Sequence, residues 1–148
     1  MYGLVMADLS AAEPPPDVTA PAAEMLASDR ASAWLGIQLT HASPGQATAV
    51  LEIEERHCNG LGVCHGGFLF TLADTAMAFA TNAGEHRAFA TNAEIDFIEA
   101  ARVGDRLTAS CHQIVSRGKA GVSDVTVTNQ DGTTVAVFRG RTLATKKS

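Results

Sequence analysis

The segment from Gly66 to Asn82 constrains the fold of this chain more than any other. It reads GGFLFTLADTAMAFATN, and its Leu, Ala, Met and Phe residues favour an α-helix that continues to about Ala83. Apolar residues recur at helical spacing along one face, and the other faces are almost as apolar. Such a helix must be covered on most sides. In a chain of 148 residues, a curved sheet wrapped around the helix achieves this.

The rest of the chain supplies such a sheet. A short helix is expected over residues 22–33, a strand should begin within residues 34–37, and apolar alternation predicts a strand over residues 46–53. Four later segments are rich in Val, Thr, Ile and Phe and are separated by Gly and Asp turn signals: residues 88–98, 107–115, 122–128 and 134–144. The sequence therefore predicts an α+β domain, with one long central helix wrapped by a curved antiparallel sheet of about five to six strands.

Length and composition fit one domain. Residues 1–22 contain four prolines and no apolar periodicity, so we expect a flexible tail followed by a single domain over residues 23–148. No uncharged apolar stretch approaches the roughly 20 residues that a membrane span needs. The chain has no Lys or Arg before Arg30, unlike a signal peptide. A cytoplasmic protein with no membrane partner is expected.

Charge is unevenly distributed along the chain. The net charge of -5 argues against nucleic acid as a partner. Residues 1–99 carry three basic and thirteen acidic side chains, whereas residues 100–148 carry eight basic and three acidic ones. The basic C-terminal half can attract an anionic ligand, although scattered solvated charge explains the same pattern.

The three cysteines, Cys58, Cys64 and Cys111, are expected to be reduced thiols, because their number is odd and no secretion signal is present. Five residues separate Cys58 from Cys64, whereas structural zinc sites pair ligands two to four residues apart, so no metal site is predicted. A nucleophilic Cys64 beside His65 is an alternative. Neighbours in sequence, however, rarely face each other productively.

Asp74 is the single ionisable residue of the apolar helix. Burying a carboxylate is costly, which favours a functional role. It can instead bond to the hydroxyl of Thr71 or Thr75, or reach solvent at the rim. Gly66 opens the same helix, whose first turn offers free N–H groups to a developing oxyanion. Eight helical residues separate Gly66 from Asp74 by about 12 Å, so a site that uses both needs a second copy with an antiparallel helix.

Several motifs carry a family resemblance. The run comprises Asn59, Cys64-His65-Gly66-Gly67, residues 72–76 and Asn82, and later stretches at residues 95–97, 104–105, 118–119 and 137–140 fit the same pattern. Over about residues 24–145, the chain resembles the hotdog-fold acyl-CoA thioesterases of the phenylacetate-degradation (PaaI-type) family. The resemblance implies a hotdog fold, with chains joined edge to edge into dimers that pair again into homotetramers.

The resemblance also implies roles for individual residues. Asp74 would act as general base or nucleophile, the Gly66 N–H would bind the thioester oxygen, and Asn59 and His65 would position thioester or water. Further residues are expected to contact the substrate: Gly67, Thr75, Thr91, Asn92, Arg102, Arg117, Gly118 and Lys119. Of these, Thr91 or Asn92 would orient the nucleophile, and the basic residues, together with Arg139 or Arg141, are candidates for the CoA phosphates.

The expected reaction is hydrolysis of an acyl-CoA thioester, with an aryl, arylacetyl or fatty acyl group. CoA is then part of the substrate and no cofactor is required, because a thioester is already electrophilic. Two other classes remain open. One is a hotdog hydratase or dehydratase, and the other is a non-catalytic acyl-CoA-binding module.

Overall fold

The computed structural model describes residue 15 and residues 17–145. The helices are α1 (Ala20–Ser28), α2 (Arg30–Leu35) and α3 (Gly66–Asn82), with a 3-10 turn, η1, at Glu55–His57. The strands are β1 (Gln38–Ser43), β2 (Gln46–Glu52), β3 (Ala88–Phe97), β4 (Arg106–Arg117), β5 (Ala120–Thr128) and β6 (Thr134–Ala144). Within this part of the chain, no helix is long and apolar enough to cross a membrane.

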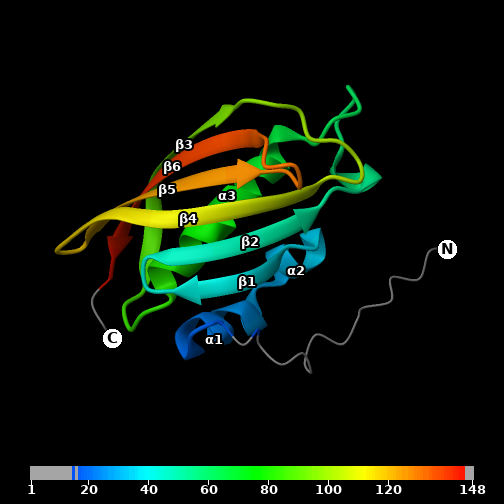
Figure 1. Ribbon diagram of the computed structural model, residues 1–148. Coiled ribbons are helices and arrows are strands. Elements are labelled where there is room, and N and C mark those ends of the chain that lie inside the picture. The colour runs from blue at the N-terminus through cyan, green and yellow to red at the C-terminus, as the bar shows by residue number, and fades with distance from the viewer. Residues whose placement is uncertain (1–14, 16, 146–148) are drawn as a thin grey trace.

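The six strands form one antiparallel sheet in the order β1-β2-β4-β5-β6-β3. The sheet curves around α3, which contacts all six strands (Figure 1). Leu72, Ala73 and Ala76 of α3 are fully buried against inward residues of the strands, such as Leu107 and Val127. The expected α+β architecture, a long helix wrapped by a six-stranded sheet, is therefore confirmed.

The N-terminal helical region differs from the expectation in two respects. Two helices replace the single one at residues 22–33, because the Asp29 carboxylate accepts a hydrogen bond from the Ser32 N–H at 2.9 Å and caps a new helix. The strand expected within residues 34–37 was wrong in position. Helix α2 runs to Leu35, Gly36 ends it with a φ of 87°, and β1 begins only at Gln38.

The expected tail, residues 1–22, falls mostly outside the described residues. Its last part is packed on the domain: the Thr19 N–H donates to the Ala42 carbonyl at 3.1 Å, and α1 begins at Ala20. Ala22 is fully buried. The boundary that we expected at residue 22 thus lies inside α1.

Strand β3 occupies one edge of the sheet and is bonded on one side only, to β6. It is ten residues long and mostly exposed, with large apolar side chains at Phe89 and Phe97 that are 64% and 55% exposed. A β-bulge between Ala90 and Asn92 shifts its register against β6. A long exposed edge of this kind is a template for pairing with another strand.

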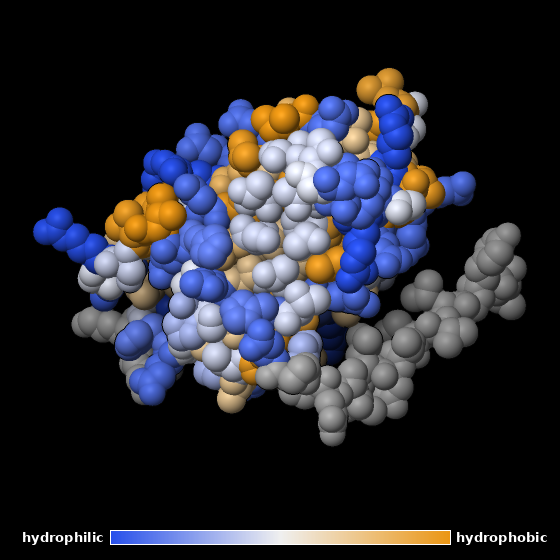
Figure 2. Space-filling view, in the orientation of Figure 1, coloured by the Kyte–Doolittle hydropathy of each residue, from blue (hydrophilic) through white to orange (hydrophobic). Residues whose placement is uncertain are grey.

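The sheet face that points away from α3 is weakly polar. Figure 2 shows this face pale across its centre, with strongly hydrophilic side chains gathered toward its sides. Outward-facing hydroxyl side chains account for the pale area: Thr48, Thr108, Ser110, Thr126 and Thr128.

Candidate functional site

Asp74 lies in the third turn of α3 and is half-buried. Its carboxylate lines a cavity of about 240 Å³ between α3 and the start of β3, together with Met77, Asn82 and Ala90. Burial raises the pKa of Asp74 above its ordinary value. Among the described residues it has no hydrogen-bond or ion-pair partner, and the Thr71 hydroxyl donates instead to the Gly67 carbonyl at 2.9 Å. Asp74 is thus a carboxyl group without a partner in the described part of the chain, and it lines a cavity.

The start of α3 keeps one backbone donor free. His65 is the N-cap residue, and its Nδ1 accepts a hydrogen bond from the Gly67 N–H at 2.9 Å. The Phe68 N–H donates to the His65 carbonyl at 2.9 Å. The Gly66 N–H has no acceptor within the described part of the chain. It therefore remains available to a ligand at the positive end of the helix dipole.

Gly66 and Gly67 therefore differ in their hydrogen bonding: among the described residues the Gly66 N–H is free, whereas the Gly67 N–H is bonded to His65. Gly67 is occupied by the helix cap, and a Cβ added to it would come within 3.1 Å of the His65 Nδ1, so its small size gives the imidazole room. Because Nδ1 is an acceptor, the neutral imidazole carries its proton on Nε2. The exposed Nε2–H of His65 can then donate to a ligand.

Asn59 shapes the loop that precedes the helix. Its side-chain oxygen accepts hydrogen bonds from the N–H groups of Leu61 at 2.9 Å and Val63 at 3.4 Å. Its backbone N–H donates to the Val63 carbonyl at 2.8 Å. The side-chain amide N–H groups of Asn59 have no acceptor among the described residues and can reach a ligand.

Two predicted polar residues of β3, Thr91 and Asn92, form hydrogen bonds with Arg141 of β6. Asn92 accepts a hydrogen bond from the Arg141 guanidinium at 2.8 Å. Its neighbour Ala93 pairs with Gly140, whose Cα faces Met77 of α3, so Asn92 points to the opposite side of the sheet from Asp74 of the same chain. The Thr91 hydroxyl, at the bulge, donates to the Arg141 carbonyl at 3.3 Å.

Thr75 is 8% exposed and lines neither the Asp74 cavity nor the one at the far end of α3 described next. Its position on the helix directs it into the core. The structure therefore does not bring Thr75 to Asp74's cavity within one chain, although the two are adjacent in sequence.

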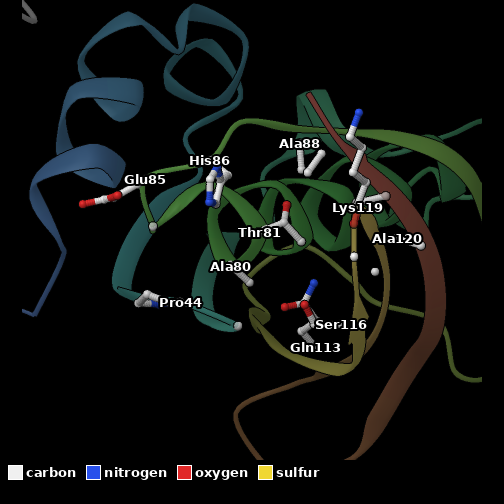
Figure 3. A pocket seen from close by; sticks show the side chains of 16 residues that line it. Pro44, Ala80, Thr81, Glu85, His86, Ala88, Gln113, Ser116, Lys119 and Ala120 are labelled. Carbon is white, nitrogen blue, oxygen red and sulfur yellow. The ribbon is translucent and has the colours of Figure 1, made fainter. Parts of the chain in front are cut away.

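A second cavity of about 260 Å³ lies at the C-terminal end of α3, under the hairpin between β4 and β5 (Figure 3). It is lined by Thr81, His86, Gln113, Gly118 and Lys119, among others. Figure 3 shows the Lys119 side chain extending away from the cavity, with its ammonium group at the outer end. Neither Lys119 nor the adjacent Arg117 forms an ion pair in the described part of the chain.

The basic residues predicted to contact phosphates are not gathered in one chain. The Cys64 N–H donates to the Ala101 carbonyl at 2.8 Å, which places Arg102 near the start of α3. Arg117 and Lys119 lie at the other end of β4, a strand of 12 residues that spans more than about 30 Å. Arg139 is held by the Asp124 carboxylate at 2.6 and 2.8 Å, so its charge is already neutralised.

Sequence reasoning missed two residues of the site. The ring of Phe97, at the end of β3, lies against Gly66. Asn82 joins the end of α3 to the start of β3, because its amide donates to the Ala88 carbonyl at 3.0 Å and its oxygen accepts from the Ala88 N–H at 2.9 Å. Asn82 and Phe97 both stood in stretches that fit the family pattern, but no role in the site was predicted for either.

The described residues contain no group of three His, Cys, Asp or Glu side chains that could hold a metal ion. The Cys64 thiol is a poor nucleophile, since burial, and to a smaller extent the nearby Cys58, raise its pKa to about 11.

Comparison with known proteins identifies the family. The model of the thioesterase superfamily matches residues 61–136, the stretch that contains Gly66 and Asp74. The chain belongs to the thioesterase superfamily. The acyl-coenzyme A thioesterase PaaI of Escherichia coli is 40% identical over 118 residues, which cover 79% of this chain and 84% of that protein. The expectation of a PaaI-type thioesterase enzyme is therefore confirmed.

Solved structures of similar proteins agree with the fold. The structure of E. coli PaaI superposes with a TM-score of 0.84 at 35% identity and covers 86% of this chain and 93% of that one. A Streptococcus mutans protein bound to acetyl CoA has a TM-score of 0.72 at 25% identity, over 75% of this chain and 90% of that one. The hotdog fold expected from the sequence is thus confirmed.

Proposed function

We propose that the chain hydrolyses acyl-CoA thioesters to a free acid and CoA, at a site shared by two copies of the chain. The observation that carries the proposal is the half-buried Asp74 carboxylate, which has no partner among the described residues and faces a cavity. E. coli PaaI, a relative at 40% identity, is named an acyl-coenzyme A thioesterase, and the S. mutans structure at 25% identity holds acetyl CoA. Both support CoA esters as the substrate class.

The sharing of the site follows from helix geometry. Gly66 and Asp74 of one chain lie about 12 Å apart along α3, too far to act on one thioester carbon. A second copy whose α3 runs antiparallel brings its Gly66 N–H to the first copy's Asp74. The exposed edge of β3, with Phe89 and Phe97, supports joining the two sheets there.

The proposed reaction needs only these groups. Asp74 takes a proton from water, whose oxygen attacks the thioester carbon, while the Gly66 N–H stabilises the negative charge on the carbonyl oxygen. The C–S bond then breaks, and the CoA thiolate leaves and is protonated. Attack by the Asp74 carboxylate itself, through an anhydride that water hydrolyses, uses the same geometry. We assign the orientation of the thioester or the water to the Asn59 amide N–H groups and the His65 Nε2–H, since the Asn59 oxygen and the His65 Nδ1 are already occupied.

The CoA phosphates are assigned to basic groups from both copies. With antiparallel helices, Arg102 beside one helix start approaches the half of the other copy that carries Arg117 and Lys119. Phosphate binding favours such unpaired cations. We assign Gly118 a structural role in the turn of that hairpin, because its φ of 60° suits glycine.

Of the residues on β3, Thr91 remains the proposed polar neighbour of the nucleophile. A cytoplasmic location and assembly into a dimer of dimers also stay predictions. The weakly polar outer face of the sheet, with its hydroxyl side chains, is compatible with contact between two dimers.

The reaction class is tested with a panel of aryl-, arylacetyl- and fatty-acyl-CoA esters. Release of free thiol, measured with a chromogenic disulfide, is expected for wild type and not for Asp74→Asn. A change of enoyl absorbance without thiol release would identify a hydratase. Tight binding of the esters with neither signal would identify a binding module.

A further inference from the structure

Cys58 and Cys64 lie directly opposite each other in an isolated antiparallel bridge. The Asn59 N–H donates to the Val63 carbonyl at 2.8 Å, and the His65 N–H donates to the His57 carbonyl at 2.8 Å. These bonds flank the two cysteines, so the cysteines themselves form a non-hydrogen-bonded pair, whose Cα atoms are about 4.5 Å apart. That separation lies within the range of disulfide-linked cysteines, about 4.4–6.8 Å.

The backbone on both sides of the pair is fixed. His57 is buried, with Nδ1 accepting from the Glu54 N–H at 2.9 Å and Nε2 donating to the Leu35 carbonyl at 3.0 Å. On the other strand, the Cys64 N–H donates to the Ala101 carbonyl at 2.8 Å. A bond between the two sulfurs therefore requires rotation of two side chains and no refolding of the loop.

In the reduced protein, the two thiols donate hydrogen bonds to different backbone carbonyls. The Cys58 Sγ donates to the Glu54 carbonyl at 3.7 Å, and the Cys64 Sγ donates to the His65 carbonyl at 3.7 Å. These are weak contacts that cost little to give up. Cys58 is half-buried and open to a small oxidant, whereas Cys64 is 5% exposed. The pair thus combines an accessible thiol with a sheltered one.

We propose that Cys58 and Cys64 form a reversible disulfide under oxidation by a peroxide, and that this bond slows turnover. The Cys58 thiolate attacks hydrogen peroxide, the O–O bond breaks, and Cys58 becomes a sulfenic acid with release of hydroxide. The Cys64 thiol forms little free thiolate, and it reacts because the bridge holds it opposite Cys58. Its sulfur attacks the sulfenic sulfur and the S–O bond breaks, while the Cys64 proton passes to the hydroxide that leaves. The two thiol protons convert the two hydroxides to water. Two electrons pass from the thiols to the peroxide, and a dithiol returns them.

The bond would act on the start of α3. It closes a ring around residues 59–63, which include Asn59, and it draws Cys64 away from the His65 carbonyl. That carbonyl also accepts from the Phe68 N–H at 2.9 Å, in the first helical turn. His65 and Gly66 follow Cys64 directly in the chain. The effect on turnover rests on the proposed function, whereas formation of the bond does not.

The bond is tested by mass spectrometry on the full chain. The protein is treated with hydrogen peroxide, quenched with catalase, unfolded, alkylated with iodoacetamide and digested with trypsin. Both cysteines fall in the peptide of residues 57–87, and Cys111 falls in a different one. The expected peptide 57–87 has lost two hydrogens, resists alkylation and takes two alkyl groups after reduction, while Cys111 is alkylated throughout. Sulfinic acid at Cys58, two alkylated thiols, or a link between chains would overturn the proposal.

The effect on turnover is tested with Cys58→Ser, a change at the half-exposed member of the pair. Peroxide should reduce CoA release by wild type several-fold, dithiothreitol should restore it, and Cys58→Ser should keep its turnover under peroxide. An equal loss in Cys58→Ser, or unchanged turnover in fully cross-linked wild type, would overturn the regulatory claim. If neither form releases CoA, the proposed function fails while the thiol measurement still decides the disulfide.

Discussion

The ring of Phe97 lies against the Cα of Gly66, so that a Cβ at position 66 would come within 2.9 Å of the Phe97 Cζ. This contact joins the free end of β3 to the start of α3. It also explains why residue 66 is glycine, since a backbone N–H donor alone makes no demand on the side chain. Gly66 therefore has two distinct properties: it leaves space for the Phe97 ring, and its N–H can donate a hydrogen bond. Two substitutions test these properties independently.

Gly66→Ala and Gly66→Pro form a matched pair. Both add a Cβ toward Phe97, but only proline removes the N–H. Proline is well suited to the first helical position, and His65 already has the extended φ of -61° and ψ of 132° that a following proline requires. Gly66→Pro should lower kcat by about 10²–10³-fold, as removal of an oxyanion donor does. Gly66→Ala should lose much less, because alanine keeps the backbone N–H.

Circular dichroism melting controls for folding in both variants. Similar melting temperatures with a large difference in kcat would support the N–H donor. Equal kcat in the alanine and proline variants would show that the N–H takes no part.

The pH dependence of turnover should report the Asp74 carboxyl. Burial raises its pKa, so kcat/KM should rise with pH through a midpoint above the ordinary aspartate value of about 3.9 and then level off. Asp74→Asn should lower kcat/KM by about 10²-fold or more and abolish that rise. A wild-type profile without the rise, or an active Asp74→Asn variant, would contradict the role of Asp74.

The same substitution should affect stability in the opposite direction. A carboxyl whose pKa is raised in the folded state stabilises the fold below its unfolded pKa, and this contribution is lost as pH rises through the folded pKa. Burial disfavours the charged form of Asp74, so Asp74→Asn should melt at a higher temperature than wild type at a pH above the folded pKa of Asp74. At pH 3 the difference should vanish. A lower melting temperature of Asp74→Asn above the folded pKa would mean that the carboxylate has a stabilising partner.

Gly140 offers a test of packing beside the Asp74 cavity, which Met77 also lines. A Cβ at this position of β6 would overlap the sulfur of Met77, which is 1% exposed and fixed between α3 and the sheet. Gly140→Ala should reduce the free energy of unfolding by about 1–3 kcal/mol, measured in urea. Gly60→Ala is the matched control, because no atom lies within 4 Å of its added Cβ. Equal effects of the two substitutions would contradict the packing of Met77 against β6.

The hairpin between β4 and β5 should contribute to substrate affinity. Replacing Arg117 and Lys119 together by alanine should raise KM for acyl-CoA about tenfold and weaken its dependence on ionic strength. The control is Arg106→Ala, at the opposite end of β4, where the guanidinium is paired with Glu52 at 2.9 Å. A matching rise of KM in Arg106→Ala would argue against a specific phosphate site at the hairpin.

The sequence was sufficient to predict the central helix and the strands, because both leave periodic patterns. The helix was expected from Gly66 to about residue 83 and ends at Asn82, and all four late strands lie within two residues of their expected bounds. The strand expected within residues 34–37 failed, because Trp34 and Leu35 suit a strand and a short helix equally. The helix is favoured because Asp29 caps its N-terminus and Gly36 ends it in a left-handed conformation.

The orientation of Asn92 shows what alternation alone cannot predict. The bulge at Thr91 adds one residue to β3, and every side chain beyond it changes sides relative to a regular strand. Asn92 therefore bonds Arg141 on the outer face. The contact of Phe97 with Gly66 is a second example, because it depends on how far β3 extends past the start of α3. Such contacts arise from the packing of distant segments.

The central claim is that Asp74 and the Gly66 N–H act together from different copies of the chain. Mixing the inactive variants Asp74→Asn and Gly66→Pro after mild unfolding and refolding tests it most directly. If the site is shared, each mixed dimer has one intact site and one doubly defective site, so a 1:1 mixture should recover about a quarter of wild-type CoA release. If the site lies within one chain, every site carries a defect. A mixed dimer, verified by mass, that stays as inactive as its parents would contradict the shared site.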